Sequence, residues 1–254
     1  MKPNRINKNR KRHIPNILTV LNMFLGFLAI GMLIKGDPIK AGWLVLFAGV
    51  FDAVDGKIAR LLGIPSRFGT EFDSFADTIS FCVAPSVLIY TTYVQGLPPI
   101  LGGLISFIPL LFGTIRLARF NVLQEKDPKP YFIGLTTPLN ALFIFGYMLF
   151  CDKISGNTGD PRIAILLVVI MGLLMISPVR FSKIPLISFR KGRKNTYRLL
   201  GVFALLVSLI LLRGIVLFPL LSVYILWCVV AWVINPHEIV DSMSIKNPSE
   251  REIL

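Results

Sequence analysis

The chain has 254 residues, of which 54% are hydrophobic, and its mean hydropathy of +0.69 is too high for a soluble domain of this size. Its net charge of +13 comes from 27 lysines and arginines against 14 acidic residues, and the basic residues lie almost wholly between apolar stretches. This pattern excludes a soluble globular protein and argues against nucleic-acid binding. It favours a polytopic helical membrane protein whose basic loops face anionic lipid.

In chain order, residues 1–16 are basic and are expected to form a disordered cytoplasmic arm. Eight apolar helical segments follow, and most of them are long enough to cross about 30 Å of hydrocarbon. Pro85 is expected to kink the third of these helices. The predicted helices span residues 17–34, 39–62, 67–94, 100–121, 132–150, 162–178, 199–212 and 215–234.

The distribution of charge predicts how these helices are oriented. With the N-terminus in the cytoplasm and eight crossings, 22 of the 27 lysines and arginines face the cytoplasm, as the positive-inside rule requires. The expected fold is therefore an all-α transmembrane bundle in the cell membrane, with a cytoplasmic N-terminus. Its expected parts are the arm 1–16, a membrane domain 17–180, a basic loop 181–198, a further hairpin 199–234 and a cytoplasmic tail 235–254.

Four aspartates interrupt the apolar sequence on two adjacent predicted helices. Asp52 and Asp55 lie near the end of the second helix, and Asp73 and Asp77 lie near the start of the third. At about 100° per residue, each pair shares a helix face with small residues, and the charge count places all four carboxylates on the cytoplasmic side. Acidic groups are expensive in such a setting, so they are interpreted as functional.

Clustered carboxylates repel one another unless a cation lies between them. Oxygen ligands select hard ions, so the sequence predicts Mg²⁺ or Mn²⁺, with Ca²⁺ as an alternative. Two such ions suit the transfer of a phosphoryl-type group. Gly56 and Ala59 leave space for a substrate beside the acids, and Arg60 adds positive charge for a phosphate.

The cysteines and the histidines are not candidate metal ligands. Cys82, Cys151 and Cys228 have no metal-binding spacing and are interpreted as inert thiols. His13 and His237 stand alone at membrane edges. A lone Asp-x-x-Asp would be a solvated helix end, but the full pattern specifies every gap: Asp52-x2-Asp55-Gly56-x2-Ala59-Arg60-x8-Gly69-x3-Asp73-x3-Asp77.

This pattern resembles the signature of the CDP-alcohol phosphatidyltransferases. The resemblance implies an integral membrane enzyme with a six-helix core, usually a homodimer, that uses a divalent metal and displaces CMP from a CDP-linked lipid with a hydroxyl group. It implies that Asp52, Asp55 and Asp73 ligate metal, and that Asp77 adjoins or joins this metal set and acts as the general base. It also implies that a CDP-lipid pocket is lined by Gly56, Ala59, Arg60 and Gly69.

Other segments resemble the bacterial and archaeal phosphatidylserine synthase branch of this family. They are residues 72–77, 80–86, 116–121 and 131–138, although Thr136 replaces a proline that is common in that branch. The likeness covers roughly residues 13–180. It implies that CDP-diacylglycerol and L-serine are the substrates.

Arg116 and Arg119 are the candidates for binding the carboxylate of serine. They lie at i and i+3 and can face one pocket, while anchoring to surface phosphates is the alternative role. The main alternative function is the same chemistry with glycerol 3-phosphate, inositol phosphate or choline as acceptor. A cation transporter is a remote alternative, because transporters place their acids near the bilayer midplane.

Overall fold

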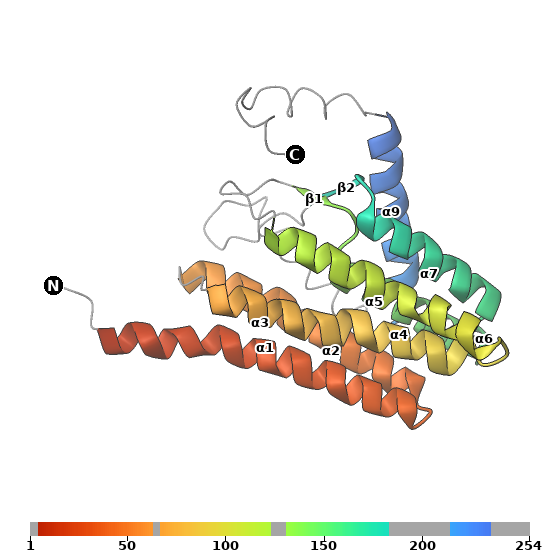
Figure 1. Ribbon diagram of the computed structural model, residues 1–254, viewed down its shortest axis with the longest axis horizontal. Coiled ribbons are helices and arrows are strands. Elements are labelled where there is room, and N and C mark those ends of the chain that lie inside the picture. The colour runs from red at the N-terminus through yellow and green to blue at the C-terminus, as the bar shows by residue number, and fades with distance from the viewer. Residues whose placement is uncertain (1–4, 63–66, 123–130, 183–213, 235–254) are drawn as a thin grey trace.

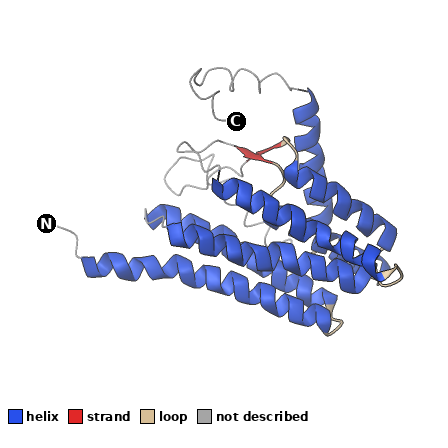
Figure 2. Ribbon diagram, viewed as in Figure 1, coloured by secondary structure: helices blue, strands red, loops and turns tan. Residues whose placement is uncertain are grey.

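The protein folds into a bundle of helices with one short pair of strands (Figures 1 and 2). A computed structural model describes residues 5–62, 67–122, 131–182 and 214–234. The predicted helix 199–212, most of the basic loop and the tail 235–254 lie outside these residues. The elements are α1 (Arg5–Ile34), α2 (Pro38–Leu62), α3 (Arg67–Asp77), the π-helix η1 (Thr78–Val83), α4 (Ala84–Leu88), the π-helix η2 (Ile89–Tyr93), α5 (Pro99–Val122), β1 (Tyr131–Ile133), α6 (Thr137–Ser155), α7 (Pro161–Ile176), β2 (Arg180–Ser182) and α9 (Leu217–Ile234).

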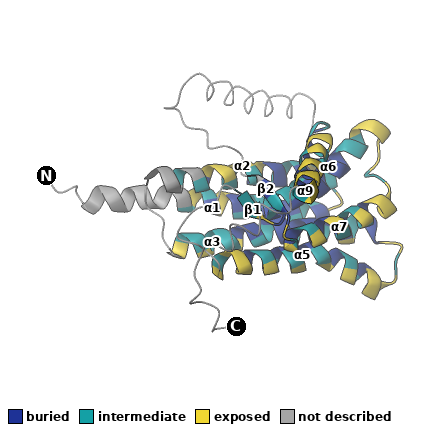
Figure 3. Cartoon of the chain, turned by 90° about the horizontal axis from the view of Figure 1, so that it is seen from above, coloured by how far each residue is buried: buried dark blue, intermediate teal, exposed yellow. Residues whose placement is uncertain are grey.

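Four of the described helices are long and apolar enough to cross a membrane, which agrees with an all-α polytopic membrane protein. Many large apolar residues of the described helices are exposed, as lipid contact requires. Figure 3 shows where exposed residues lie along the helices. The number of crossings, eight, stays a prediction. The four candidate spans are Asn16–Ile34, Phe68–Tyr93, Pro99–Val122 and Leu217–Ile234.

The predicted disorder of residues 1–16 is wrong for its larger part, because α1 begins at Arg5. Helix nucleation is the costly step, whereas each residue added to an existing helix costs little. The apolar span supplies the nucleus, and the helix continues from it through Pro15 into residues 5–14, which contain no glycine or proline.

The predicted helix 132–150 also starts too early. Residues 131–133 form β1, which pairs antiparallel with β2, so Phe132 lies opposite Phe181. Gly134 then turns the chain with φ +74°, and its N–H donates to the Val179 carbonyl at 2.8 Å. Helix α6 begins only at Thr137, since Pro138 is tolerated in a first turn but not deeper in a helix.

Residues 67–93 are helical throughout, and the winding changes between π and α on both sides of Pro85. The π-helix η1 follows Asp77, and the Ala84 N–H bonds to the Ile79 carbonyl. Pro85 then sits in the first turn of α4, where its missing N–H is tolerated. The predicted irregularity is therefore a π-to-α transition, which is a feature often found near functional sites.

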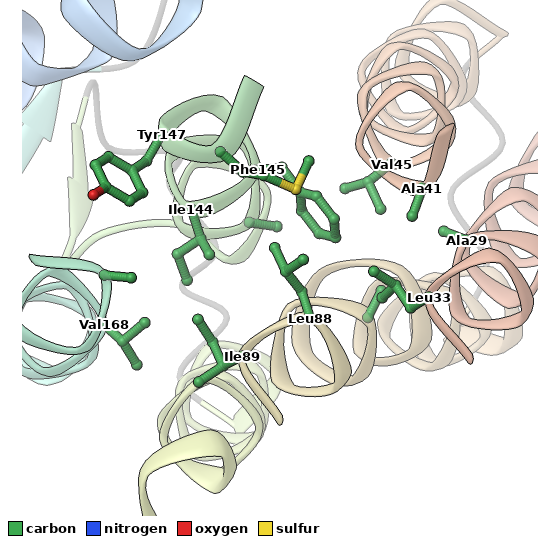
Figure 4. Close-up of a cluster of buried hydrophobic side chains, with 14 of the residues drawn as sticks. Ala29, Leu33, Ala41, Val45, Leu88, Ile89, Ile144, Phe145, Tyr147 and Val168 are labelled. Carbon is green, nitrogen blue, oxygen red and sulfur yellow. The ribbon is translucent and has the colours of Figure 1, made fainter. Parts of the chain in front are cut away.

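The bundle core lies where α1, α2, α4, α6 and α7 meet (Figure 4). Ala29 and Ala41 are fully buried and leave room for α1 and α2 to approach closely. Larger side chains such as Leu88 and Phe145 fill the centre. Helix α9 instead crosses the other helices steeply, running upward in Figure 1 and end-on in Figure 3.

Gly26 lets α1 approach η1 more closely than any side chain would allow. A Cβ atom at this position would lie 2.7 Å from the Ser80 Cα. This contact is backed by a hydrogen bond of 2.9 Å from the Ser80 hydroxyl to the Asn22 carbonyl. Gly26 therefore sets the distance between α1 and the helix that carries Asp77.

Replacing Gly26 with alanine is expected to destabilise the protein by about 1–3 kcal/mol, because the added methyl group overpacks the α1–η1 contact. The measurement is thermal or denaturant unfolding in detergent. Gly31→Ala is the matched control on the same helix, since a Cβ there meets no described atom within 4 Å. Equal stabilities of the two variants would contradict the packing argument.

Candidate functional site

The aspartates meet where α2 ends and α3 begins, at the left end of the bundle in Figure 1. Asp52 and Asp55 lie in the last three turns of α2, and Asp73 lies in the second turn of α3. One carboxylate oxygen from each of these three residues lies within 4.8 Å of the others. The structure therefore brings together three side chains that two separate helices contribute.

The environment of this cluster fits a hard divalent cation. Asp55 is only 3% exposed, and Asp52 and Asp73 are half-buried. Asp73 Oδ1 is buried and has no hydrogen-bond partner among the described residues. Ionised carboxylates this close repel one another strongly when water is scarce. A bound cation would remove the repulsion and satisfy Asp73 Oδ1, so the donor set fits the predicted metal.

Asp77 lies beside this cluster, one helical turn after Asp73, and is buried. It interacts electrostatically with the other three aspartates and with Arg116. It is not part of the group whose oxygens lie within 4.8 Å. This separation from the three clustered carboxylates is compatible with a distinct task for Asp77.

Helix α1 supplies two polar side chains that the sequence analysis did not assign to the site. Thr19 donates its hydroxyl to Asp55 Oδ2 at 3.1 Å. Asn22, which is fully buried, donates from Nδ2 to Asp77 Oδ1 at 3.5 Å, at the long end of the hydrogen-bond range. They are the two polar residues of an otherwise apolar span, and their i, i+3 spacing places them on one helix face. This spacing is the sequence feature that could have indicated their role in the site.

The predicted space beside the acids exists at Gly56. A Cβ atom at Gly56 would meet no described atom within 4 Å, so the α2 backbone is open there. Gly69 lies half-buried in the first turn of α3. Ala59 and Arg60 belong to the last turn of α2, and their side chains lie outside the described part of the structure.

The two candidate arginines occupy different environments. Arg116 is partly buried and interacts with Asp77, and its Nε is enclosed without a hydrogen-bond partner among the described residues. Arg119 is exposed. The structure therefore brings Arg116, and not Arg119, next to the buried acid.

A polar network holds α5 against α3 beside the site. Asn121 Nδ2 donates to Ser74 Oγ at 3.0 Å and to Glu71 Oε2 at 3.4 Å. Further along, Gly113 allows α5 to pack directly on Cys82 of η1. Together these contacts fix the helix segment that carries Arg116. The site thus combines clustered carboxylates, a further buried acid and a partly buried cation, which suits transfer of a phosphate-linked group.

The chain is similar to a family of known proteins over most of its length. Residues 12–178 match the family model described as CDP-alcohol phosphatidyltransferase. A Helicobacter pylori protein named CDP-diacylglycerol–serine O-phosphatidyltransferase is 32% identical over 86% of this chain and 90% of its own length. Proteins of the same name from Methanocaldococcus jannaschii and Bacillus subtilis are 38% and 35% identical, over 68% and 66% of this chain and 75% and 89% of their own lengths. This membrane protein therefore belongs to the CDP-alcohol phosphatidyltransferase family of transferases.

Proposed function

We propose that this protein transfers the phosphatidyl group of CDP-diacylglycerol to the hydroxyl of L-serine, which yields phosphatidylserine and CMP. The observation that carries the proposal is the cluster of Asp52, Asp55 and Asp73 beside the buried Asp77, which interacts electrostatically with the partly buried Arg116. The names of the relatives support serine as the acceptor. Family membership favours this enzyme over a cation transporter.

The aspartate cluster would hold one or two ions of Mg²⁺ or Mn²⁺. When bound, the metal would neutralise charge on the pyrophosphate and on the leaving CMP oxygen. Gly56 leaves the backbone open for the CDP group, and the last turn of α2 brings Ala59 and Arg60 to the same helix end.

Asp77 is the group that takes the proton from the serine hydroxyl. The serine oxygen then bonds to the phosphorus linked to diacylglycerol, and the bond from that phosphorus to the oxygen of CMP breaks. A serine hydroxyl is a poor nucleophile at neutral pH, so a positioned base is required. Asn22 bonds to one oxygen of Asp77 and thereby orients the carboxylate.

The partly buried Arg116 is the proposed partner of the carboxylate of serine. Arg116→Ala is expected to raise the KM for serine about tenfold to a hundredfold, since hydrogen bonds between charged groups are worth about 1.5–3 kcal/mol. Arg119→Ala is expected to change it less, because Arg119 is exposed. The measurement is CMP release at varied serine and at varied CDP-diacylglycerol. Equal effects of the two substitutions on serine would move the carboxylate site elsewhere.

The proposed function is tested with purified protein, CDP-diacylglycerol, Mg²⁺ or Mn²⁺ and a panel of alcohols, by following CMP release. Serine is expected to be the preferred acceptor. Release of CMP with glycerol 3-phosphate, inositol phosphate or choline but not with serine would overturn the proposal. A homodimer with its active site at the cytoplasmic face is part of the proposal, and the positive-inside charge pattern supports that orientation.

A further inference from the structure

The first turn of α6 carries two buried polar side chains that make no side-chain hydrogen bond to any described residue. Thr137 is fully buried and Asn140 is 1% exposed. Thr137 Oγ1 and both polar atoms of the Asn140 amide have no hydrogen-bond partner among the described residues. Buried polar groups are nearly always paired, so three unpaired atoms on one helical turn call for a ligand.

These side chains lie at the level of the aspartate cluster. Helix α6 packs against α2 and η1. Met148 lies beside Gly42, and Leu142 lies beside Gly49, so the two helices run antiparallel. Asn140 precedes Leu142 by two residues, which is about half a helical turn. In this antiparallel arrangement it therefore lies opposite the turn of α2 that contains Asp52.

The end of α6 is itself open to an anionic group. Thr136, the residue before the helix, makes no side-chain capping bond, so its hydroxyl does not occupy the backbone N–H groups of the first turn, which Thr137 and Leu139 supply. A helix N-terminus carries partial positive charge, and helical side chains lean toward the N-terminus. Thr137 and Asn140, at i and i+3, therefore share one face and lean toward this end.

We infer that Thr137 and Asn140 form the subsite that recognises the acceptor as a zwitterionic hydroxy amino acid. The inference rests on the proposed function. Asn140 Oδ1 accepts a hydrogen bond from the ammonium group, and Asn140 Nδ2 and the Thr137 hydroxyl donate to the carboxylate, which Arg116 also faces. An amide supplies one acceptor and one donor side by side, which matches the two charged groups of an amino acid.

The test measures KM values in CMP release for wild type and for Asn140→Leu, Asn140→Asp and Thr137→Val. Asn140→Leu is expected to raise the KM for serine about tenfold to a hundredfold and Thr137→Val several-fold, with the KM for CDP-diacylglycerol unchanged. Asn140→Asp is expected to raise the activity with ethanolamine relative to serine, because the new carboxylate repels the carboxylate of serine but not the ammonium group. Ser106→Ala, which removes a buried hydroxyl bonded within α5, is the matched control and is expected to leave both KM values unchanged.

Thermal unfolding without substrate separates a binding role from a structural one. Since the Asn140 amide has no hydrogen-bond partner in the described part of the structure, Asn140→Leu is expected to keep or raise the Tm. A lowered Tm together with a serine KM within twofold of wild type would show a structural role and overturn the inference. If the wild type itself uses serine poorly, the proposed function and this inference both fail. If the wild type uses serine well and the Asn140 variants do so equally, only the inference fails.

Discussion

Asp77→Asn is expected to leave CDP-diacylglycerol binding intact and to lower turnover about a hundredfold to ten-thousandfold, which is the usual contribution of a general base. Asparagine keeps the shape of the side chain and the contact from Asn22, but it cannot accept the hydroxyl proton. The measurement is single-turnover CMP release at saturating serine, alongside equilibrium binding of the CDP-lipid.

The matched control for this substitution is Asp37→Asn. Asp37 is the partner of Lys40 in an exposed ion pair of 2.6 Å, in the turn at the opposite end of α2. This variant is expected to turn over normally, because exposed pairs contribute little. Normal turnover by Asp77→Asn would assign the base to another residue.

Asp73→Asn is expected to abolish the stabilisation of the protein by Mg²⁺ or Mn²⁺ and to raise its stability when metal is chelated. The first effect follows from the loss of a ligand and the second from weaker repulsion within the cluster of three carboxylates. In the wild type, metal at a hundredfold its Kd should stabilise by about 2.7 kcal/mol.

The measurement for this second prediction is thermal unfolding in detergent, with chelator and with each metal. A Tm above that of the wild type with chelator, together with a smaller rise in Tm on adding metal, would be specific to the loss of a metal ligand. An unchanged metal response in Asp73→Asn would place the metal elsewhere and would remove the main support for the site. The same comparison with Asp37→Asn is expected to show wild-type behaviour in both conditions.

The cluster of aspartates was predictable because, in a helix, the spacing of residues in the sequence determines which face their side chains share. Once 39–62 and 67–94 are interpreted as helices, the i, i+3 and i, i+4 spacings place the aspartates on two faces. The short connector then requires those faces to meet at one end of the bundle. The structure confirms the meeting of Asp52, Asp55 and Asp73.

The contributions of α1 and α6 were less predictable, since each depends on contacts across the bundle. In the sequence, Thr19 and Asn22 are isolated polar residues in an apolar span. They contact Asp55 and Asp77 only because α1 packs against α2 and η1. The spacing of Arg116 and Arg119 does not distinguish the two residues. The packing of α5 against η1 leaves Arg116 partly buried and Arg119 exposed.

Hydropathy and charge in the sequence alone determined that this is a helical membrane protein, because burial of apolar length in lipid is a local property of each segment. The family signature likewise lies within one continuous stretch. Only the tertiary structure decided the separation of Asp77 from the other three carboxylates, the π-winding after it and the steep crossing of α9. These features arise from packing between segments far apart in the chain, which periodicity and length do not specify.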